Sequence, residues 1–333
     1  MEWTADVSVG EWLRERIDPW RGTMHDVVPR GFAAYARVLH PTTRSRPVGR
    51  DWPPIPQDRH RREWERFADD GVQIETEPAL WRDAAASFGT TLHPLAQWGA
   101  LVKSRGDEWS PSDWQQAQSA DGWQYDAPRE GELDAAVTAA LAQHLVARAG
   151  AQAGYAAVWS GWGGLLGHMG VTPSRGFLTL TAGEDDDADL ARHREMLALS
   201  RSDPFNRPYA TETWQRGILA DDVSRGPLLE LPGREHVLFA GALEVFADPL
   251  WQRRVPWHDV ELENAGFAST AASPSLLWPD DRSWVLTTDV DWDSTIVGGD
   301  ADLIAAICAD PALEALPIAA DSSLQWDADE VNR

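Results

Sequence analysis

Three aspartates near the C-terminal end of the 333-residue chain have a spacing that could support chemistry. Asp289, Asp291 and Asp293 alternate with apolar residues, and in a strand this period of two would place all three carboxylates on one face. Converging carboxylates can bind a hard cation or act as a general acid and a general base. We name the three aspartates as candidate catalytic residues, with a solvated strand face as the alternative.

A glycine-rich turn marks a second candidate site. The turn at 161–167 resembles a dinucleotide-binding loop, but its third glycine is not at the required spacing and no helix start follows. A hairpin or close backbone packing is therefore the better interpretation. Trp159, Trp162 and His168 lie beside the turn. Because indole rings are favoured anchors in interfaces, we predict that these residues line a ligand- or partner-binding cleft.

Several motifs that would indicate a cofactor or a metal are missing from the sequence. The nine histidines show no HExxH pair and no cysteine–histidine spacing of a zinc site. No GxSxG element is present. Lys103 is the only lysine, so Schiff-base chemistry or phosphate binding by a lysine would depend on this one residue. We predict no cofactor and no metal site.

The charge of the chain limits its partners. Acidic residues number 53 against 29 lysines and arginines, which gives a formal net charge of −24. Nucleic acids and anionic membrane surfaces are bound through clustered positive charge, so neither is expected as a partner. A basic protein is the natural complement of such a surface.

The cellular location can also be predicted from composition. The N-terminus lacks the basic start and apolar run of a signal peptide, and no apolar stretch approaches the roughly 20 residues needed to span a bilayer. Cys308 is the only cysteine, so the chain cannot form an internal disulfide. These features predict a cytoplasmic protein.

Hydrophobic periodicity predicts an α+β fold with a mixed or antiparallel sheet and N-terminal helices packed on it. We expect one domain over 1–333, helix-rich in 1–150 and sheet-containing in 151–333, with an insertion at 168–230. The expected sheet segments lie near 155–159, 177–181, 236–239 and 284–297.

The last of these segments is expected to be structurally central. In the predicted strand 284–297, Trp284 and Trp292 would pack inward with the neighbouring apolar residues, opposite the aspartate face. Gly298 and Gly299 would then form a turn into a helix at 302–309.

Several phrases of the sequence resemble a known group of proteins. They are Pro29–Phe32 through Leu39–Pro41, Gly89–Pro94 with Gln97–Trp98, Val158–Gly163, Leu231–Glu235, Ser273–Pro279 with Asp281–Trp284, and Thr288–Asp291 through Ser294–Gly299. Together they resemble an uncharacterised family of acidic, Trp-rich actinobacterial proteins of unknown function. The resemblance implies a bacterial cytosol and carries no known activity, cofactor or catalytic residue.

Two hypotheses of different classes follow. The first is a cytosolic binding or interaction protein, immunity- or adaptor-like, with an acidic surface lined by some of the 19 tryptophans. The alternative is a hydrolase that acts on a carbohydrate-like or other polar small substrate through paired carboxylates, with Glu235 and Asp281 as further candidates behind the three aspartates. The absence of a complete catalytic motif favours the first hypothesis.

Overall fold

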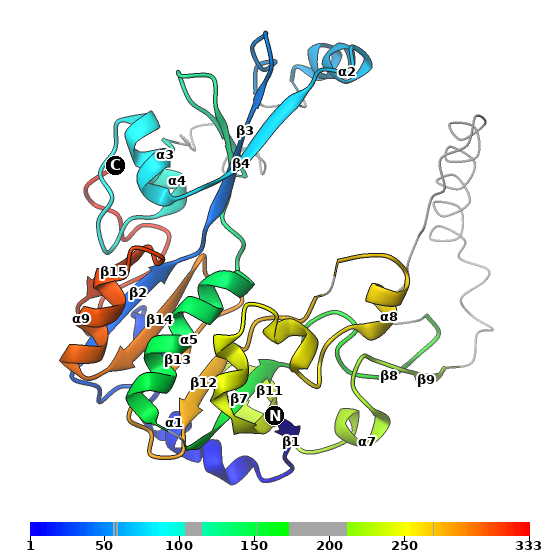
Figure 1. Cartoon of the computed structure of the whole chain (residues 1–333), viewed down its shortest axis with the longest axis vertical. Helices are drawn as coiled ribbons and strands as arrows, with labels where there is room; N and C mark the ends of the chain where they lie inside the picture. The colour runs from blue at the N-terminus through cyan, green and yellow to red at the C-terminus, as the bar shows by residue number, and fades with distance from the viewer. Residues whose placement is uncertain (56, 58, 104–114, 151, 173–211, 269) are drawn as a thin grey trace.

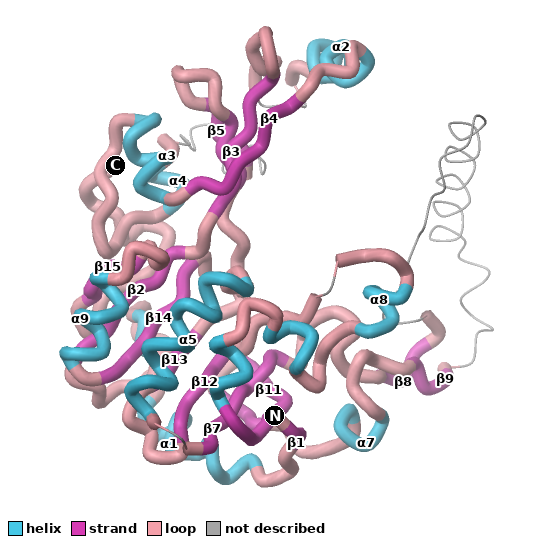
Figure 2. Tube along the Cα trace, in the orientation of Figure 1, coloured by secondary structure: helices cyan, strands magenta, loops and turns pink. Residues whose placement is uncertain are grey.

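The computed structural model, drawn in Figures 1 and 2, describes residues 1–55, 57, 59–103, 115–150, 152–172, 212–268 and 270–333. Its centre is a nine-stranded sheet of order β1-β11-β7-β12-β13-β14-β2-β15, with β10 paired to β11, and every pairing is antiparallel. The strands are β1 (Glu2–Trp3), β2 (Ala34–Leu39), β7 (Ala153–Trp159), β10 (Leu229–Leu231), β11 (Arg234–Ala242), β12 (Leu276–Pro279), β13 (Val285–Thr287), β14 (Ser294–Gly299) and β15 (Ala315–Ile318).

Two smaller sheets accompany the central one. A four-stranded antiparallel sheet has the order β4-β3-β6-β5 and stands above the central sheet in Figure 1. Its strands are β3 (Thr42–Pro47), β4 (Ile74–Ala79), β5 (Gln116–Gln118) and β6 (Gln124–Asp126). A two-stranded sheet pairs β8 (His168–Gly170) with β9 (Thr213–Gln215).

Helices cover one face of the central sheet. The longest is α5 (Ala135–Ala149), which begins where the Asp134 carboxylate accepts hydrogen bonds from two backbone amides and ends at Gly150. It lies beside α9 (Ala301–Ala309), η3 (Leu243–Ala247) and η4 (Trp251–Arg254), as Figure 2 shows. Alternate strand residues such as Val158, Phe239 and Leu286 pack with these helices in the largest core cluster.

The opposite face of the sheet is covered by the N-terminal segment. Here η1 (Val7–Gly10), α1 (Glu11–Arg16) and η2 (Met24–Asp26) pack against the other set of alternate strand residues, including Leu238, Leu276 and Trp278. The remaining helices within the described residues are α2 (Arg61–Asp69), α3 (Trp81–Phe88), α4 (Trp98–Leu101), α7 (Asp221–Ser224) and α8 (Val260–Asn264). Both faces of the central sheet are therefore buried.

The predicted α+β class with antiparallel pairing is confirmed. The expected division into helices before 150 and sheet after it is too simple, because β2 to β6 precede residue 150 while α9 follows it. The segments near 155–159 and 236–239 are strands, whereas 177–181 and most of the predicted insertion lie outside the described residues. The single domain over 1–333 stays a prediction.

The predicted continuous strand over 284–297 is wrong. The segment is a hairpin in which β13 pairs with β14 and residues 288–293 form the connection. Trp284 is buried as expected, but Trp292 is only half-buried at the edge of a smaller core cluster. Gly298 and Gly299 belong to β14 rather than to a turn, and α9 follows with Asp300 as its N-cap.

Candidate functional site

The candidate aspartates lie in the β13–β14 connection rather than on a strand face. Asp289 is buried, and its Oδ1 accepts a hydrogen bond from the backbone amide of Asp291 at 2.9 Å, which turns the chain. The backbone amide of Gly131 donates to the carbonyl oxygen of Trp292 at 2.8 Å and holds the loop from the outside. Backbone and side-chain hydrogen bonds therefore fix the loop.

Arg234 binds two of the three aspartates. Its Nε and Nη2 donate to the two carboxylate oxygens of Asp289 at 3.2 and 3.1 Å, and Nη2 also donates to Asp291 at 2.6 Å. The Asp289 side chain is 8% exposed and that of Asp291 is 78% exposed. Burial of the guanidinium opposes its charge, but hydrogen bonds and attraction from both aspartates prevail and raise the pKa of Arg234.

Asp293 is bound by a different arginine, which is fully buried. Arg37 on β2 donates from Nη2 to Asp293 at 3.1 Å, from Nε to Ser294 Oγ at 2.8 Å, and from Nη1 to the carbonyl oxygens of Ala96 and Pro94 at 2.7 and 3.1 Å. Burial lowers the pKa of Arg37, and Asp293 opposes that shift. None of the three candidate catalytic carboxylates is left without a cationic partner.

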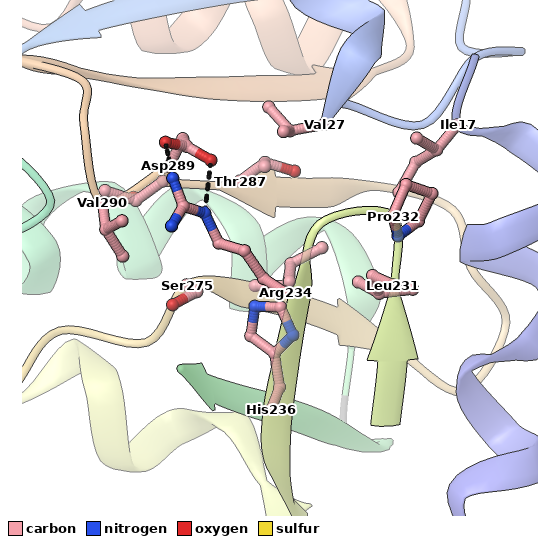
Figure 3. A pocket seen from close by; sticks show the side chains of 12 residues that line it. Ile17, Val27, Leu231, Pro232, Arg234, His236, Ser275, Thr287, Asp289 and Val290 are labelled. Atoms are coloured by element: carbon pink, nitrogen blue, oxygen red, sulfur yellow. Dashed lines mark hydrogen bonds and ion pairs between the residues drawn. The ribbon is translucent and has the colours of Figure 1, made fainter. Parts of the chain in front are cut away.

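A small pocket lies beside the Arg234–Asp289 pair, at the ends of β11, β12 and β13 (Figure 3). Its enclosed volume is about 30 Å³, which exceeds the space one water molecule needs. We call it the Arg234 pocket. Its lining consists of Ile17, Val27, Leu231, Pro232, Arg234, His236, Ser275, Leu276, Thr287, Thr288, Asp289 and Val290.

Two side chains of the Arg234 pocket have unsatisfied polar atoms. Nδ1 of His236 and Oγ1 of Thr287 are buried and have no hydrogen-bond partner within the described part of the chain. Burial lowers the pKa of His236 to about 4, with the Arg234 charge acting in the same direction and a backbone hydrogen bond to Leu229 opposing it. The imidazole is therefore neutral at pH 7 and turned toward Arg234 and Ser275 (Figure 3).

An open groove of about 490 Å³ lies along the β10–β11 hairpin. Glu230 and Glu235 are directly opposite each other in the hairpin register, so their side chains share one face. Neither carboxylate has an ion pair or side-chain hydrogen bond with any other described residue, and both residues are exposed. We call this the β10–β11 groove, and its lining consists of Trp159, Ser160, Glu230, Leu231, Gly233, Arg234 and Glu235.

The tryptophans predicted to line a cleft have different positions. Trp159 lines the β10–β11 groove, and the Arg234 guanidinium carbon lies 5.4 Å from its ring centre. Trp162 makes an edge-to-face contact with Trp159 at 5.6 Å and is half-buried against the main core. His168 is exposed on β8, where it pairs with Gln215, and no described contact joins it to the groove.

The two further carboxylate candidates are also separated. Glu235 lies in the β10–β11 groove. Asp281 accepts hydrogen bonds from the side chain of Gln152 at 3.0 Å and from the amide of Ser283 at 2.9 Å, so it shapes the turn between β12 and β13.

Sequence reasoning missed the residues that organise this region: Arg234, His236, Ser275 and Thr287. One signal was present, because His236 opens an otherwise apolar strand run and a polar residue at such a position needs a reason to be buried. The pairing of Arg234 with Asp289, 55 positions apart, had no sequence signal.

No group of three or more histidine, cysteine, aspartate or glutamate residues in the described ranges is placed to hold a metal ion. Within the same ranges, every helix is too short or too polar to cross a membrane. No protein-family model, curated protein or solved structure matches the chain.

Proposed function

We propose that the chain is a binding protein that recognises a basic partner protein through the β10–β11 groove. The observation that supports this is the cross-strand pair of Glu230 and Glu235, whose exposed carboxylates make no described ion pair. The nearby arginines are used elsewhere: Arg14 donates to the backbone carbonyl oxygen of Glu230, and Arg234 binds Asp289 and Asp291. Like charges directly opposite each other in a sheet repel. A lysine or arginine side chain placed between them would replace this repulsion with attraction, and Trp159 supplies an aromatic surface beside them.

The hydrolase hypothesis has weaker support. Acid–base catalysis by two carboxylates needs groups in different environments, one that stays protonated and one that stays ionised. Asp289, Asp291 and Asp293 are bound to arginines, while Glu230 and Glu235 share the same exposed surroundings. A binding role needs no such asymmetry. A cytoplasmic location and an immunity- or adaptor-like role remain part of this proposal.

The proposal can be tested with short peptides and the full chain. A lysine–glycine peptide should bind and change the tryptophan fluorescence, whereas a glutamate–glycine peptide of equal length should not. The double variant Glu230→Gln/Glu235→Gln should weaken lysine-peptide binding about tenfold, as expected for the loss of two charge contacts.

A matched control separates the groove from general acidity. Glu63→Gln/Glu65→Gln on α2 makes the same charge change on two exposed residues far from the groove. This variant should retain the affinity of the parent. Equal weakening by both double variants would show that only the net charge attracts the peptide, and the groove proposal would be abandoned.

A further inference from the structure

The Arg234 pocket has features that the proposed partner groove does not use. The two share only Leu231 and Arg234 in their linings. His236 and Thr287 are each 3% exposed, and each has a buried polar atom without a described partner. Buried polar groups in folded proteins are almost always hydrogen-bonded, so two such groups beside one pocket indicate that a hydrogen-bonding occupant belongs there.

The remaining hydrogen-bonding groups of the pocket define what that occupant must offer. Nε and Nη2 of Arg234 are used by Asp289 and Asp291, while Nη1 has no described partner. The oxygen of Ser275 accepts from the backbone amide of Trp159 at 3.3 Å, and the hydroxyl hydrogen can still be donated. Arg234, Ser275 and Thr287 thus supply donors. The one N–H of the neutral His236 ring is used by the backbone of Leu229, so its unpartnered Nδ1 supplies an acceptor.

Charge selects against ions. Arg234 and Asp289 are the charged residues of the pocket lining, and their opposite charges pair with each other, so the wall offers neither an anion nor a cation a net charge to bind. A cation would need an available carboxylate oxygen, but both oxygens of Asp289 already accept hydrogen bonds. An uncharged group that both accepts and donates hydrogen bonds fits best.

Size and lining narrow the class further. The volume of about 30 Å³ accommodates roughly two water-sized positions, and the lining includes the apolar residues Ile17, Pro232 and Val290. A carboxamide has one acceptor oxygen, one donor nitrogen and an apolar stem. We propose that the Arg234 pocket binds the uncharged carboxamide group of a small molecule, with its carbonyl oxygen toward Arg234 and Thr287.

The test uses three probes of the same shape and different charge: acetamide, acetate and acetamidinium. Titration of the full chain, followed by the NMR signals of the His236 ring and the Trp159 backbone amide, should give at least about tenfold tighter binding for acetamide than for either ion. Equal binding of acetate or acetamidinium would overturn the charge argument. Binding of none of the three would show that the pocket holds water only.

Two variants of one residue test the site itself. Thr287→Val keeps the shape of the side chain and removes the hydroxyl, so it should weaken acetamide binding about tenfold while the protein remains folded by circular dichroism. Thr287→Ser restores a hydroxyl and should restore binding. Unchanged acetamide affinity in Thr287→Val would refute the assignment.

The outcome is independent of the partner groove. Glu230→Gln/Glu235→Gln should leave acetamide affinity unchanged, because neither glutamate lines the Arg234 pocket. A loss of lysine-peptide binding without a loss of acetamide binding would separate the two sites. Parallel loss of both would show that they form one site and would contradict a distinct carboxamide pocket.

Discussion

Two hairpins of the central sheet differ in whether their carboxylates form ion pairs. In the β13–β14 hairpin, Asp289 and Asp293 are each bound to an arginine. In the β10–β11 hairpin, Glu230 and Glu235 face each other, and neither carboxylate makes a described ion pair. A dense run of carboxylates is therefore not by itself a sign of function; the cations that the fold brings to each carboxylate decide whether it is available.

Two buried histidines extend the same comparison. His40 packs against β14, where Nδ1 donates to the carbonyl oxygen of Arg129 at 2.6 Å and Nε2 accepts from Thr295 Oγ1 at 3.0 Å. His236 on β11 has an unpartnered Nδ1. The protein satisfies both ring nitrogens of His40, whereas it leaves one ring nitrogen of His236 available for a ligand.

The largest expected effect on stability comes from the buried arginine that binds Asp293 in the β13–β14 connection. Arg37→Met removes a fully buried cation and leaves Asp293 and two carbonyl oxygens without their donor. We expect a loss of about 3–5 kcal/mol in the free energy of unfolding, measured by urea denaturation. Arg21→Met breaks an exposed pair with Asp18 and should cost less than about 1 kcal/mol. If the two variants lost similar amounts of unfolding free energy, Asp293 would need no buried partner.

Alanine substitution at two glycines, one beside each hairpin, should lower the free energy of unfolding by smaller and different amounts. Gly131 has φ +72°, and an added Cβ would lie 2.7 Å from the backbone of Val290 in the aspartate loop. Gly233 at the β10–β11 turn has φ +80° but open space around it. Gly131→Ala should cost about 2–4 kcal/mol, whereas Gly233→Ala should cost about 1 kcal/mol for the left-handed backbone alone. Equal melting temperatures of the two variants would contradict the close packing of Gly131 against the aspartate loop.

Much of the fold could be predicted from sequence, because the relevant signals are local. Asp134 and Gly150 delimit α5, and the apolar run after Tyr155 forms β7. The β13–β14 loop was misread for a physical reason: alternation of aspartate with apolar residues describes a strand face as well as it describes a turn fixed by Asp289. The arginines that bind these aspartates lie on strands distant in the sequence, and no local sequence pattern predicts such pairings.

The pH dependence of stability should report the two buried histidines, His236 on β11 and His40 beside β14. Burial lowers the pKa of both His40 and His236 to about 4, against about 6.5 for an unfolded histidine. Between these values the unfolded chain binds more protons, so stability is lost as the pH falls. From pH 6.5 to 5 each histidine should contribute a loss of about 1.5 kcal/mol.

His236→Leu isolates one of these contributions. Urea denaturation at pH 6.5 and at pH 5 should show a loss on acidification that is smaller than in the parent by about 1.5 kcal/mol. His40 remains in this variant as an internal reference. An unchanged pH dependence would mean that His236 is hydrated in the folded protein, and the argument for an unsatisfied pocket would be weakened.

The smallest predicted effects differ in sign. Asp291→Asn removes the exposed partner of Arg234 and should lower the free energy of unfolding by less than about 1 kcal/mol. Glu230→Gln removes a repulsion with Glu235 and should raise it by about 0.2–1 kcal/mol. Both effects should shrink as salt is added, because charges in contact with solvent are screened. Thermal melts of the two single variants in low and high salt provide the measurement, and a destabilising Glu230→Gln would show that this carboxylate already has a favourable partner in the folded chain.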